Sequence, residues 1–437
     1  MSPHSLRRQP HATSFMPARL PAALCAAAIL AMLGCATVAA QEPRVPNANP
    51  RVRAALETIQ RDNAWTLDQQ VSICEIPAPP FKEQQRGEEY RRRFEALGLR
   101  NVRIDAEGNV IAERPGVGNG PTVMISGHLD TVFPEETNVK VRREGTRFHG
   151  PGIGDDCRGL AVVLAVARAF QQANVQTNGM VYFVGTVGEE GPGNLRGVRH
   201  LFTKEFPNRE IDYFISVDGT GYGTTSGAVG SHRYRVSYIG PGGHSYGAFG
   251  MPNPIHALGR AIAGISDLQV PASPRTTFNV GIIEGGTSVN SISAEGIMEI
   301  DMRSPSLDEL HRLDAQVRDI LDRALAAENA RWPRSNVKLT MKIDTIGIRP
   351  AGSQPDDAPI VRASLAAARA LGLTSETGSS STDANLPISL GIPAITIDGG
   401  GTGRGAHALD EWYDDGSDGY KGPQWAALLV ATLAGVR

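Results

Sequence analysis

The sequence predicts an α/β protein with a mostly parallel sheet flanked by helices, into which a small ferredoxin-like α+β domain is inserted. Apolar runs of strand length alternate with helical stretches along most of the chain, as in sheets that helices cover on both faces. Several of these runs end abruptly in polar, glycine-rich loops, as expected at the carboxyl ends of parallel strands. Between about residues 227 and 346 the order becomes strand, helix, strand, strand, helix, strand, which is the ferredoxin-like order.

The first part of the chain begins with helices and continues with alternating strands and helices. Helical spacing of apolar residues predicts the helices, prolines within 77–80 separate the first two, and β-branched or aromatic runs predict the strands. Helices are expected over 51–62, 83–97 and 160–170, and strands over 102–104, 110–113, 123–125, 180–187 and 211–217.

The inserted domain is expected over 227–346, so that the larger domain consists of 44–226 and 347–437. A capping box, Ser306 followed by Glu309, marks the start of its long helix. Its strands are expected over 233–238, 276–283, 296–302 and 337–343, and its helices over 254–265 and 307–327. Helices over 358–371 and 424–433 and a strand over 394–397 complete the larger domain.

Residues 1–40 have the features of a signal peptide. Arginines precede an apolar stretch over 20–33, and small residues before Gln41 offer a cleavage site. We therefore expect an exported protein, periplasmic or secreted, with no transmembrane span in its mature form. Lipoprotein anchoring at Cys35 is the less favoured alternative, because Leu33 stands one position late for such a motif.

The composition is that of an ordinary globular protein. Of 437 residues, 41% are hydrophobic and 20% charged, and the length suggests two domains. The formal net charge of −3 gives no reason to expect a nucleic-acid partner. Removal of the signal peptide leaves Cys74 and Cys157, and the sequence leaves open whether they pair.

Candidate metal ligands fall at the predicted strand ends, at a helix start and in a glycine-rich loop. They are His128, Asp156, Glu190, Asp218 and His407. Imidazole and carboxylate without thiolate suit zinc, with manganese or cobalt as alternatives. The set is too large for one tetrahedral site and fits two ions that share a bridging carboxylate and hold a water between them. Singly, each residue also has an ordinary structural explanation, such as a helix cap or a turn.

The motifs around these residues resemble those of the M20 metallopeptidase family, which includes glutamate carboxypeptidase, peptidase T, aminoacylase and succinyl-diaminopimelate desuccinylase. The resemblance covers nearly the whole mature chain in family order. The matching segments include GHLDTVFP (127–134), GIGDDCRG (152–159), GTVGEEGPGNLRG (185–197), GPGGHS (240–245) and GAHALDEW (405–412). The resemblance implies a catalytic zinc domain with an inserted lid that also forms a homodimer contact.

The resemblance also implies a role for each ligand. His128 and Asp218 would bind one zinc ion, and Glu190 and His407 the other. Asp156 would bridge the two ions; the offset of the helix from Gly159 favours it over its neighbour. A cis peptide bond is then expected after the bridging residue, at Asp156–Cys157.

Further residues receive roles in catalysis and substrate binding. Glu189 would act as the general base and then protonate the leaving amine, and Asp130 would orient His128. From the insert, the resemblance assigns His244 to oxyanion stabilisation in the partner subunit's active site, and Asn290 and Arg303 to substrate binding. Arg158 stands where the family usually has lysine.

The sequence therefore predicts a zinc metallopeptidase that cleaves an amide bond in small peptides. Asp218 favours this interpretation, because glutamate is commoner at that position in carboxypeptidases and deacylases of the family. Two alternatives stay open: an N-acyl amino acid deacylase or carboxypeptidase of the same family, and a non-catalytic binding protein on the same scaffold.

Overall fold

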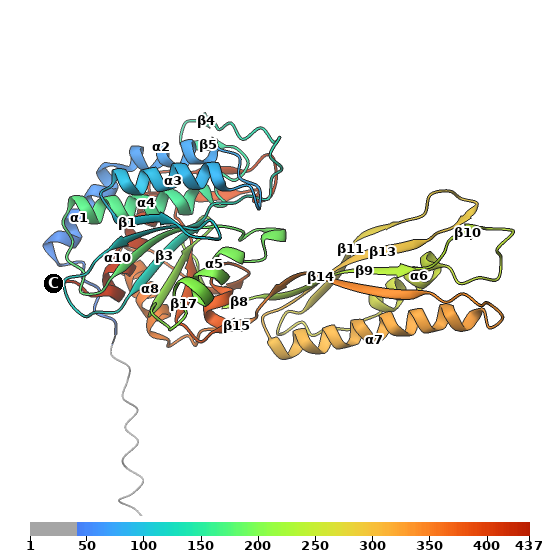
Figure 1. The fold of residues 1–437 in the computed structure, drawn as a ribbon. Helices are drawn as coiled ribbons and strands as arrows, with labels where there is room; N and C mark the ends of the chain where they lie inside the picture. Colours follow the sequence, from blue (N-terminus) through green and yellow to red (C-terminus); the bar gives the residue numbers. More distant parts are fainter. Residues whose placement is uncertain (1–41) are drawn as a thin grey trace, which may run out of the picture. The chain divides into compact units, whose positions relative to one another are not determined.

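The computed structural model describes residues 42–437, which form one compact unit (Figure 1). The predicted signal peptide and Cys35 lie outside the described residues. Among the helices of 42–437, none combines the length and the apolar character needed to cross a bilayer. The predicted domain limits at 226/227 and 346/347 stay predictions, because the described residues are not divided there.

Within the described residues, a nine-stranded sheet forms the centre of the larger part of the fold. Its strands lie in the order β1 (Arg100–Ile104), β2 (Val110–Arg114), β6 (Val181–Thr186), β3 (Val123–His128), β7 (Tyr213–Val217), β17 (Ala394–Ile397), β8 (Thr224–Ala228) and β15 (Gly352–Ser353), with β16 (Thr377–Ser380) beside β8. The central strands β6, β3, β7 and β17 are parallel to one another. Their carboxyl ends therefore meet at one edge of the sheet.

Helices cover both faces of this sheet (Figure 1). The first face packs against α1 (Pro50–Arg61), α2 (Asn63–Cys74), α3 (Gln84–Ala96), α4 (Cys157–Gln172), α8 (Pro359–Ala370) and α10 (Lys421–Ala434). The second face packs against α5 (Arg196–His200), the π-helical turn η2 (Leu201–Glu205) and α9 (Asn385–Ser389). Val123 and Ile125 belong to the first core and Met124 to the second, because successive strand residues point to opposite faces. The predicted α/β class is confirmed.

A small four-stranded sheet brings two distant loops together. It has the order β18 (Thr402–Arg404), β19 (Trp412–Asp414), β5 (Arg147–His149) and β4 (Arg142–Glu144). Since β5 and β19 pair, the loop after β5 lies beside the loop before β19, and the Gly150 amide donates to the Glu411 carbonyl at 3.0 Å. The sequence analysis did not predict these short strands.

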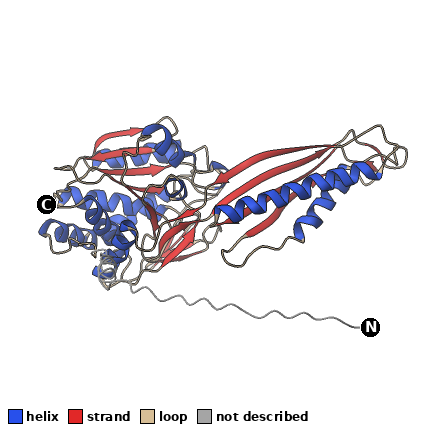
Figure 2. Ribbon diagram, turned by 90° about the horizontal axis from the view of Figure 1, so that it is seen from below, coloured by secondary structure: helices blue, strands red, loops and turns tan. Residues whose placement is uncertain are grey.

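The insert contains its own sheet and core. Its main elements are β9 (Gly230–Ile239), α6 (Pro254–Ser266), β11 (Thr277–Gly285), β13 (Glu295–Ser304), α7 (Leu307–Arg331) and β14 (Thr340–Arg349), and a short ribbon pairs β10 (Gly243–His244) with β12 (Ser291–Ile292). The antiparallel strands lie in the order β11-β13-β9-β14. Both helices pack against this sheet, and Figure 2 shows α7 running along the strands. The order of the main elements is the predicted one. Of the predicted capping box one half is present: the Glu309 amide donates to Ser306 Oγ, whereas the Ser306 amide donates to Ser304 Oγ.

Cys74 and Cys157 form a disulfide, which answers the question that the sequence left open. Their Cα atoms are 5.4 Å apart and both side chains are fully buried. The bond joins the end of α2 to the start of α4. The disulfide therefore restrains the backbone immediately after Asp155 and Asp156.

Candidate active site

The predicted site residues converge at the carboxyl edge of the central sheet. His128 ends β3, Glu189 and Glu190 follow β6, and Asp218 follows β7. A cavity of about 520 Å³ opens there. Glu189, Glu190, Asp218, Arg303 and His407 line it, and so does Asp155, which the sequence analysis had set aside.

The two histidines meet around one carboxylate, that of Asp155. His128 Nε2 lies 2.9 Å from Asp155 Oδ1, and His407 Nε2 lies 3.2 Å from Asp155 Oδ2. His407 Nε2 also lies 3.0 Å from Glu190 Oε1. One ligand atom from each of His128, Asp155 and Glu190 lies within 4.8 Å of the others, so this trio could hold a metal ion.

The structure places Asp155, and not the predicted Asp156, between the two histidines. The Asp156 carboxylate is fully buried and accepts hydrogen bonds from the backbone amides of His128 at 2.8 Å and Gly159 at 2.9 Å. It therefore caps the start of α4 and bonds to the last residue of β3. Asp155, one residue earlier, presents its carboxylate to both histidines. The expected cis bond is displaced by one position as well, because the cis peptide is Asp155–Asp156 and not Asp156–Cys157.

Glu411 holds the loop that presents Asp155. Its carboxylate accepts the backbone amides of Gly152 and Gly154, both at 2.7 Å, and of Asp155 at 3.0 Å. Burial raises the pKa of Glu411 to about 7, although these donors act in the opposite direction. The sequence analysis quoted Glu411 within the GAHALDEW motif but gave it no role.

Asp130 supports the site in a different way from the one expected. His128 Nδ1 lies 3.0 Å from the Asp130 backbone carbonyl oxygen and 3.8 Å from its carboxylate. The carboxylate itself accepts the amides of Glu189 at 3.1 Å and Glu190 at 2.8 Å. Asp130 therefore connects the end of β3 with the loop that carries both glutamates.

Glu189 is buried and paired with an arginine that the sequence analysis missed. Arg349 Nη1 donates to Glu189 Oε1 at 2.9 Å and to Ser381 Oγ at 3.1 Å, and its Nη2 donates to the Glu189 backbone carbonyl. Burial raises the pKa of Glu189 to about 8; Arg349 counteracts this effect and Glu190 adds to it.

The carboxylates of the cavity repel one another. Burial raises the pKa of Asp218 well above its usual value, and the nearby charge of Asp155 adds to the shift. Hydrogen bonds to Asp155 and Glu190 raise the pKa of His407 to about 10. Divalent cations would relieve this crowding, and two imidazoles among oxygen ligands match the donor preferences of zinc. The residues present thus fit a dinuclear metal site.

Two predicted site residues lie elsewhere. His244 and Asn290 are exposed in the β10–β12 ribbon region and are not among the described residues that line the cavity. His244 Nδ1 accepts the amides of Tyr246 and Gly247, and Asn290 Oδ1 accepts the Ser288 hydroxyl. The roles assigned to His244 and Asn290 therefore stay predictions.

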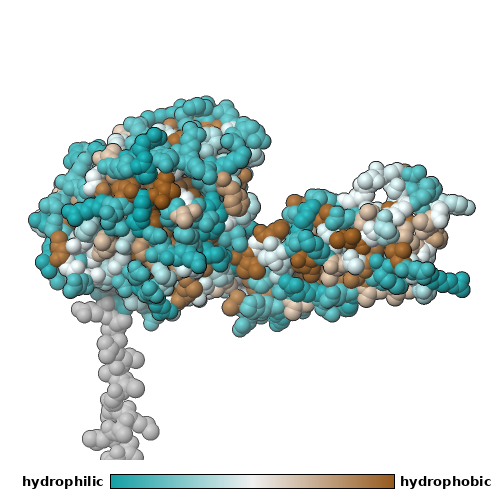
Figure 3. Space-filling view, in the orientation of Figure 1, coloured by the Kyte–Doolittle hydropathy of each residue, from teal (hydrophilic) through white to brown (hydrophobic). Residues whose placement is uncertain are grey.

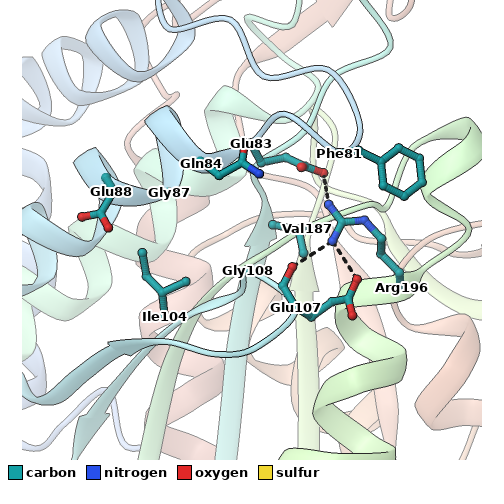
Figure 4. A pocket seen from close by; sticks show the side chains of 10 residues that line it. All are labelled: Phe81, Glu83, Gln84, Gly87, Glu88, Ile104, Glu107, Gly108, Val187 and Arg196. Atoms are coloured by element: carbon teal, nitrogen blue, oxygen red, sulfur yellow. Dashed lines mark hydrogen bonds and ion pairs between the residues drawn. The ribbon is translucent and has the colours of Figure 1, made fainter.

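A second cavity, of about 350 Å³, adjoins the segment that leads to Glu189 (Figure 4). In it Arg196 reaches Glu83 at 2.6 Å and Glu107 at 2.9 Å, and Phe81 covers the guanidinium. A Cβ on Gly188 would come within 2.6 Å of Arg196 Cγ, and φ of Gly188 is +68°. This cluster therefore fixes the turn immediately before Glu189 and requires glycine there.

A parallel sheet with two histidines and several carboxylates at its carboxyl edge is typical of metal-dependent hydrolases. The sequence model of peptidase family M20/M25/M40 matches residues 124–431. The chain belongs to this family, whose members are metal-dependent amidohydrolases.

The chain is also similar in sequence to curated relatives, and it shares its fold with solved structures. Protein YqjE of Bacillus subtilis is 24% identical over 348 residues, which cover 76% of this chain and 89% of YqjE. Succinyl-diaminopimelate desuccinylase of Bordetella avium is 27% identical over 261 residues, which cover 54% of this chain and 69% of the desuccinylase. The structure of aminopeptidase PepT from Bacillus cereus superposes on this chain with a TM-score of 0.67 and 19% sequence identity. The superposition covers 87% of this chain and 99% of PepT. A tripeptidase from Staphylococcus aureus superposes with a TM-score of 0.68 and 22% sequence identity. The superposition covers 84% of this chain and 98% of the tripeptidase.

Proposed function

We propose that the protein is an exported di-zinc metallopeptidase that hydrolyses an amide bond in di- or tripeptides. The proposal rests mainly on one observation: Glu189 lines the same cavity as the ligand cluster without belonging to it. A hydrolase of this kind needs such a carboxylate beside the metal ligands, because a general base must stand within reach of the attacking water.

The ligands of the metal pair are proposed to be His128, Asp155, Glu190, Asp218 and His407. Asp155 takes the bridging position because both histidines face its carboxylate. When bound, the two ions would supply Lewis-acid polarisation of the amide carbonyl and an acidified water. Zinc suits this set of imidazoles and carboxylates, and manganese or cobalt are alternatives.

Glu189 is proposed to move the proton. In its ionised form it accepts a proton from the attacking water and then delivers that proton to the leaving amine. Asp130 and Arg349 hold the backbone and side chain of Glu189 in place. Both Glu189 and Arg349 are almost fully buried, which limits the access of bulk water to the proton being transferred.

The substrate is proposed to be small. A cavity of about 520 Å³ accommodates a short peptide or an N-acyl amino acid. Arg303 lines it and suits a carboxylate, and structures named as an aminopeptidase and a tripeptidase share the fold. The alternative is a deacylase, because a desuccinylase is among the relatives by sequence.

A homodimer through the insert is also proposed. β11 is an edge strand of the insert's sheet and carries the exposed residues Ile282 and Ile283. Figure 3 shows apolar surface on the part of the molecule that contains this sheet. Such an edge is a favourable place for a second copy to pair, and a dimer could bring His244 to the partner subunit's site.

The proposed location is the periplasm or the medium, reached through the signal peptide predicted over residues 1–40, with Cys35 lipidation as the less favoured route. The disulfide between Cys74 and Cys157 supports the proposal, because such bonds persist mainly in oxidising compartments.

The test is a substrate comparison on zinc-loaded protein that begins at Gln41. A dipeptide, its N-acetyl form and its carboxyl-terminal amide separate aminopeptidase or dipeptidase, deacylase and carboxypeptidase activities. Glu189→Gln should lower kcat by about 10²-fold or more with zinc content unchanged, whereas Glu190→Gln should also lose zinc. Full activity in Glu189→Gln would exclude its role as the base.

A further inference from the structure

Three charged residues of the insert form a cluster that faces the catalytic cavity. Arg233 on β9 and Arg303 on β13 both donate through Nε to Asp301, at 2.8 Å and 2.7 Å. Asp301 is the cross-strand partner of Arg233, and Arg303 follows two residues later on β13. All three side chains therefore lie on the same face of the sheet.

The cluster leaves the terminal nitrogens of both arginines without a bonded partner. Among residues 42–437, Asp301 is the sole hydrogen-bonding partner of Arg233 and of Arg303. Each guanidinium uses its Nε for this bond and keeps the planar pair of Nη groups, the geometry that binds a carboxylate through two parallel hydrogen bonds. Both arginines line the cavity that contains Glu189 and His407.

The third arginine of the cavity is bound differently. Arg349 is occupied by Glu189 and Ser381 and is almost fully buried. Arg233 and Arg303 are 19% and 41% exposed, and their single shared carboxylate leaves one net positive charge. The arginine pair can therefore accept an anion, whereas Arg349 is committed to the protein.

A neighbouring arginine shows what a purely structural pair looks like on this strand. Arg235, two residues after Arg233, binds Glu299 through Nη1 at 2.6 Å and Glu284 through Nη2 at 2.7 Å. Its terminal nitrogens are occupied, and it is not among the described residues that line the cavity. Arg233, by contrast, keeps its terminal nitrogens unbonded within residues 42–437 and lines the cavity.

We infer that Arg233 is a specificity-determining residue which, together with Arg303, selects substrates that carry two carboxylates on the same residue. The favoured substrates are peptides or N-acyl compounds that end in a dicarboxylic amino acid. Arg303 holds one carboxylate and Arg233 the other, and Asp301 fixes the spacing of the two guanidinium groups. This inference rests on the proposed function and names its substrate class.

The test compares acid and amide substrates of nearly equal shape. Ala-Glu is paired with Ala-Gln, and N-acetylglutamate with N-acetylglutamine, in the wild type, Arg233→Gln and Arg235→Gln. We expect the wild type to favour the acid by about tenfold or more in kcat/KM, because the acid offers a charged acceptor to the Arg233 guanidinium and the amide only a neutral one. Arg233→Gln should reduce this preference to about twofold or less, because it removes the charged donor to the side-chain carboxylate. Arg235→Gln should keep the preference.

A binding measurement separates this inference from the proposed function. In calorimetric titrations, the wild type and Arg235→Gln should bind glutarate about tenfold or more tightly than glutaramate, and Arg233→Gln should bind both alike. Arg233→Lys, which keeps the charge, should retain part of the preference. Equal binding of the two probes by the wild type, or an unchanged preference in Arg233→Gln, overturns the inference. If no substrate is hydrolysed while glutarate is still preferred, the proposed function fails and the arginine site stands.

Discussion

Arg349 and Glu189, which are 160 positions apart in the chain, form a buried ion pair at the edge of the catalytic cavity. Arg349 ends β14, the strand that leads from the insert back to the larger part of the fold. It bonds both the carboxylate and the backbone carbonyl of Glu189, so it fixes the side chain and the main chain together. Glu189 is thus held by a residue that lies at the end of the insert's last strand.

Replacing Arg349 with methionine is expected to lower both stability and turnover. The change leaves Glu189 buried beside Glu190 without its counter-charge, and breaking a buried pair of this kind costs about 3–5 kcal/mol when the carboxyl is ionised, which for Glu189 means above its pKa of about 8. We expect a loss of that order in urea unfolding at about pH 9 and a fall in kcat of about tenfold or more, with smaller effects for Arg349→Lys.

Arg199→Met provides the matched control for Arg349. Arg199 donates to the neighbouring Ile348 carbonyl at 3.2 Å, is only half-buried, and has no carboxylate partner among residues 42–437. The variant Arg199→Met should have the same free energy of unfolding and the same kcat as the wild type. Wild-type stability and kcat in Arg349→Met would show that the ion pair has no role.

Asp155 and Asp156 should respond in opposite ways to the same substitution. Asp155→Asn removes the carboxylate between His128 and His407 and should lower the metal content measured by mass spectrometry, with little change in stability. Asp156→Asn keeps one acceptor oxygen for the two backbone amides and turns its NH2 group towards the other, so it should lower the free energy of unfolding by about 1–3 kcal/mol while metal is retained. Retention of metal by Asp155→Asn together with its loss from Asp156→Asn would restore the original assignment.

The sequence predicted most of the larger fold because its strands have continuous apolar runs that end in polar loops. The same property placed His128, Glu190 and Asp218 at one edge. It could not separate Asp155 from Asp156, because a shift of one residue in the helix start decides which carboxylate caps the helix and which faces the histidines.

Other contacts around the site join residues far apart in the chain, and no local sequence pattern predicts them. Glu411 binds the amide of Gly152, 259 positions earlier, and Arg349 reaches Glu189 from the end of the insert's last strand. The strands β4, β5, β18 and β19 have only three residues each, too few for a periodic pattern. Such pairings become visible only when the chain is folded.

Reduction of the disulfide between Cys74 and Cys157 is expected to destabilise the protein markedly. The bond spans 83 positions, and a loop of that length corresponds to about 4.5 kcal/mol in the chain-entropy description. Urea unfolding with and without a reductant measures the difference. The double variant Cys74→Ala/Cys157→Ala should unfold close to the reduced wild type and should not respond to reductant. Identical midpoints for the oxidised and reduced wild type would contradict this expectation.

Asp398, which follows β17, should make stability fall as the pH rises. Burial raises its pKa to about 6, although the Gly223 amide, which donates to Oδ2 at 2.6 Å, acts in the opposite direction. A raised carboxyl pKa means that the folded state binds the proton more tightly than the unfolded chain, whose value is about 3.9. This contribution to stability is therefore complete below about pH 4 and is lost as the pH rises through 6.

Asp398→Asn removes the titrating group and keeps an oxygen for the Gly223 amide. At pH 7 the variant should be more stable than the wild type by about 2–3 kcal/mol, and the difference should shrink towards zero near pH 4. Urea unfolding at pH 4, 5, 6 and 7 measures this trend. Glu57→Gln, at an exposed position of α1, controls for the loss of one negative charge and should give no such slope. A stability difference that stays constant across this pH range would mean that Asp398 does not titrate as its burial requires.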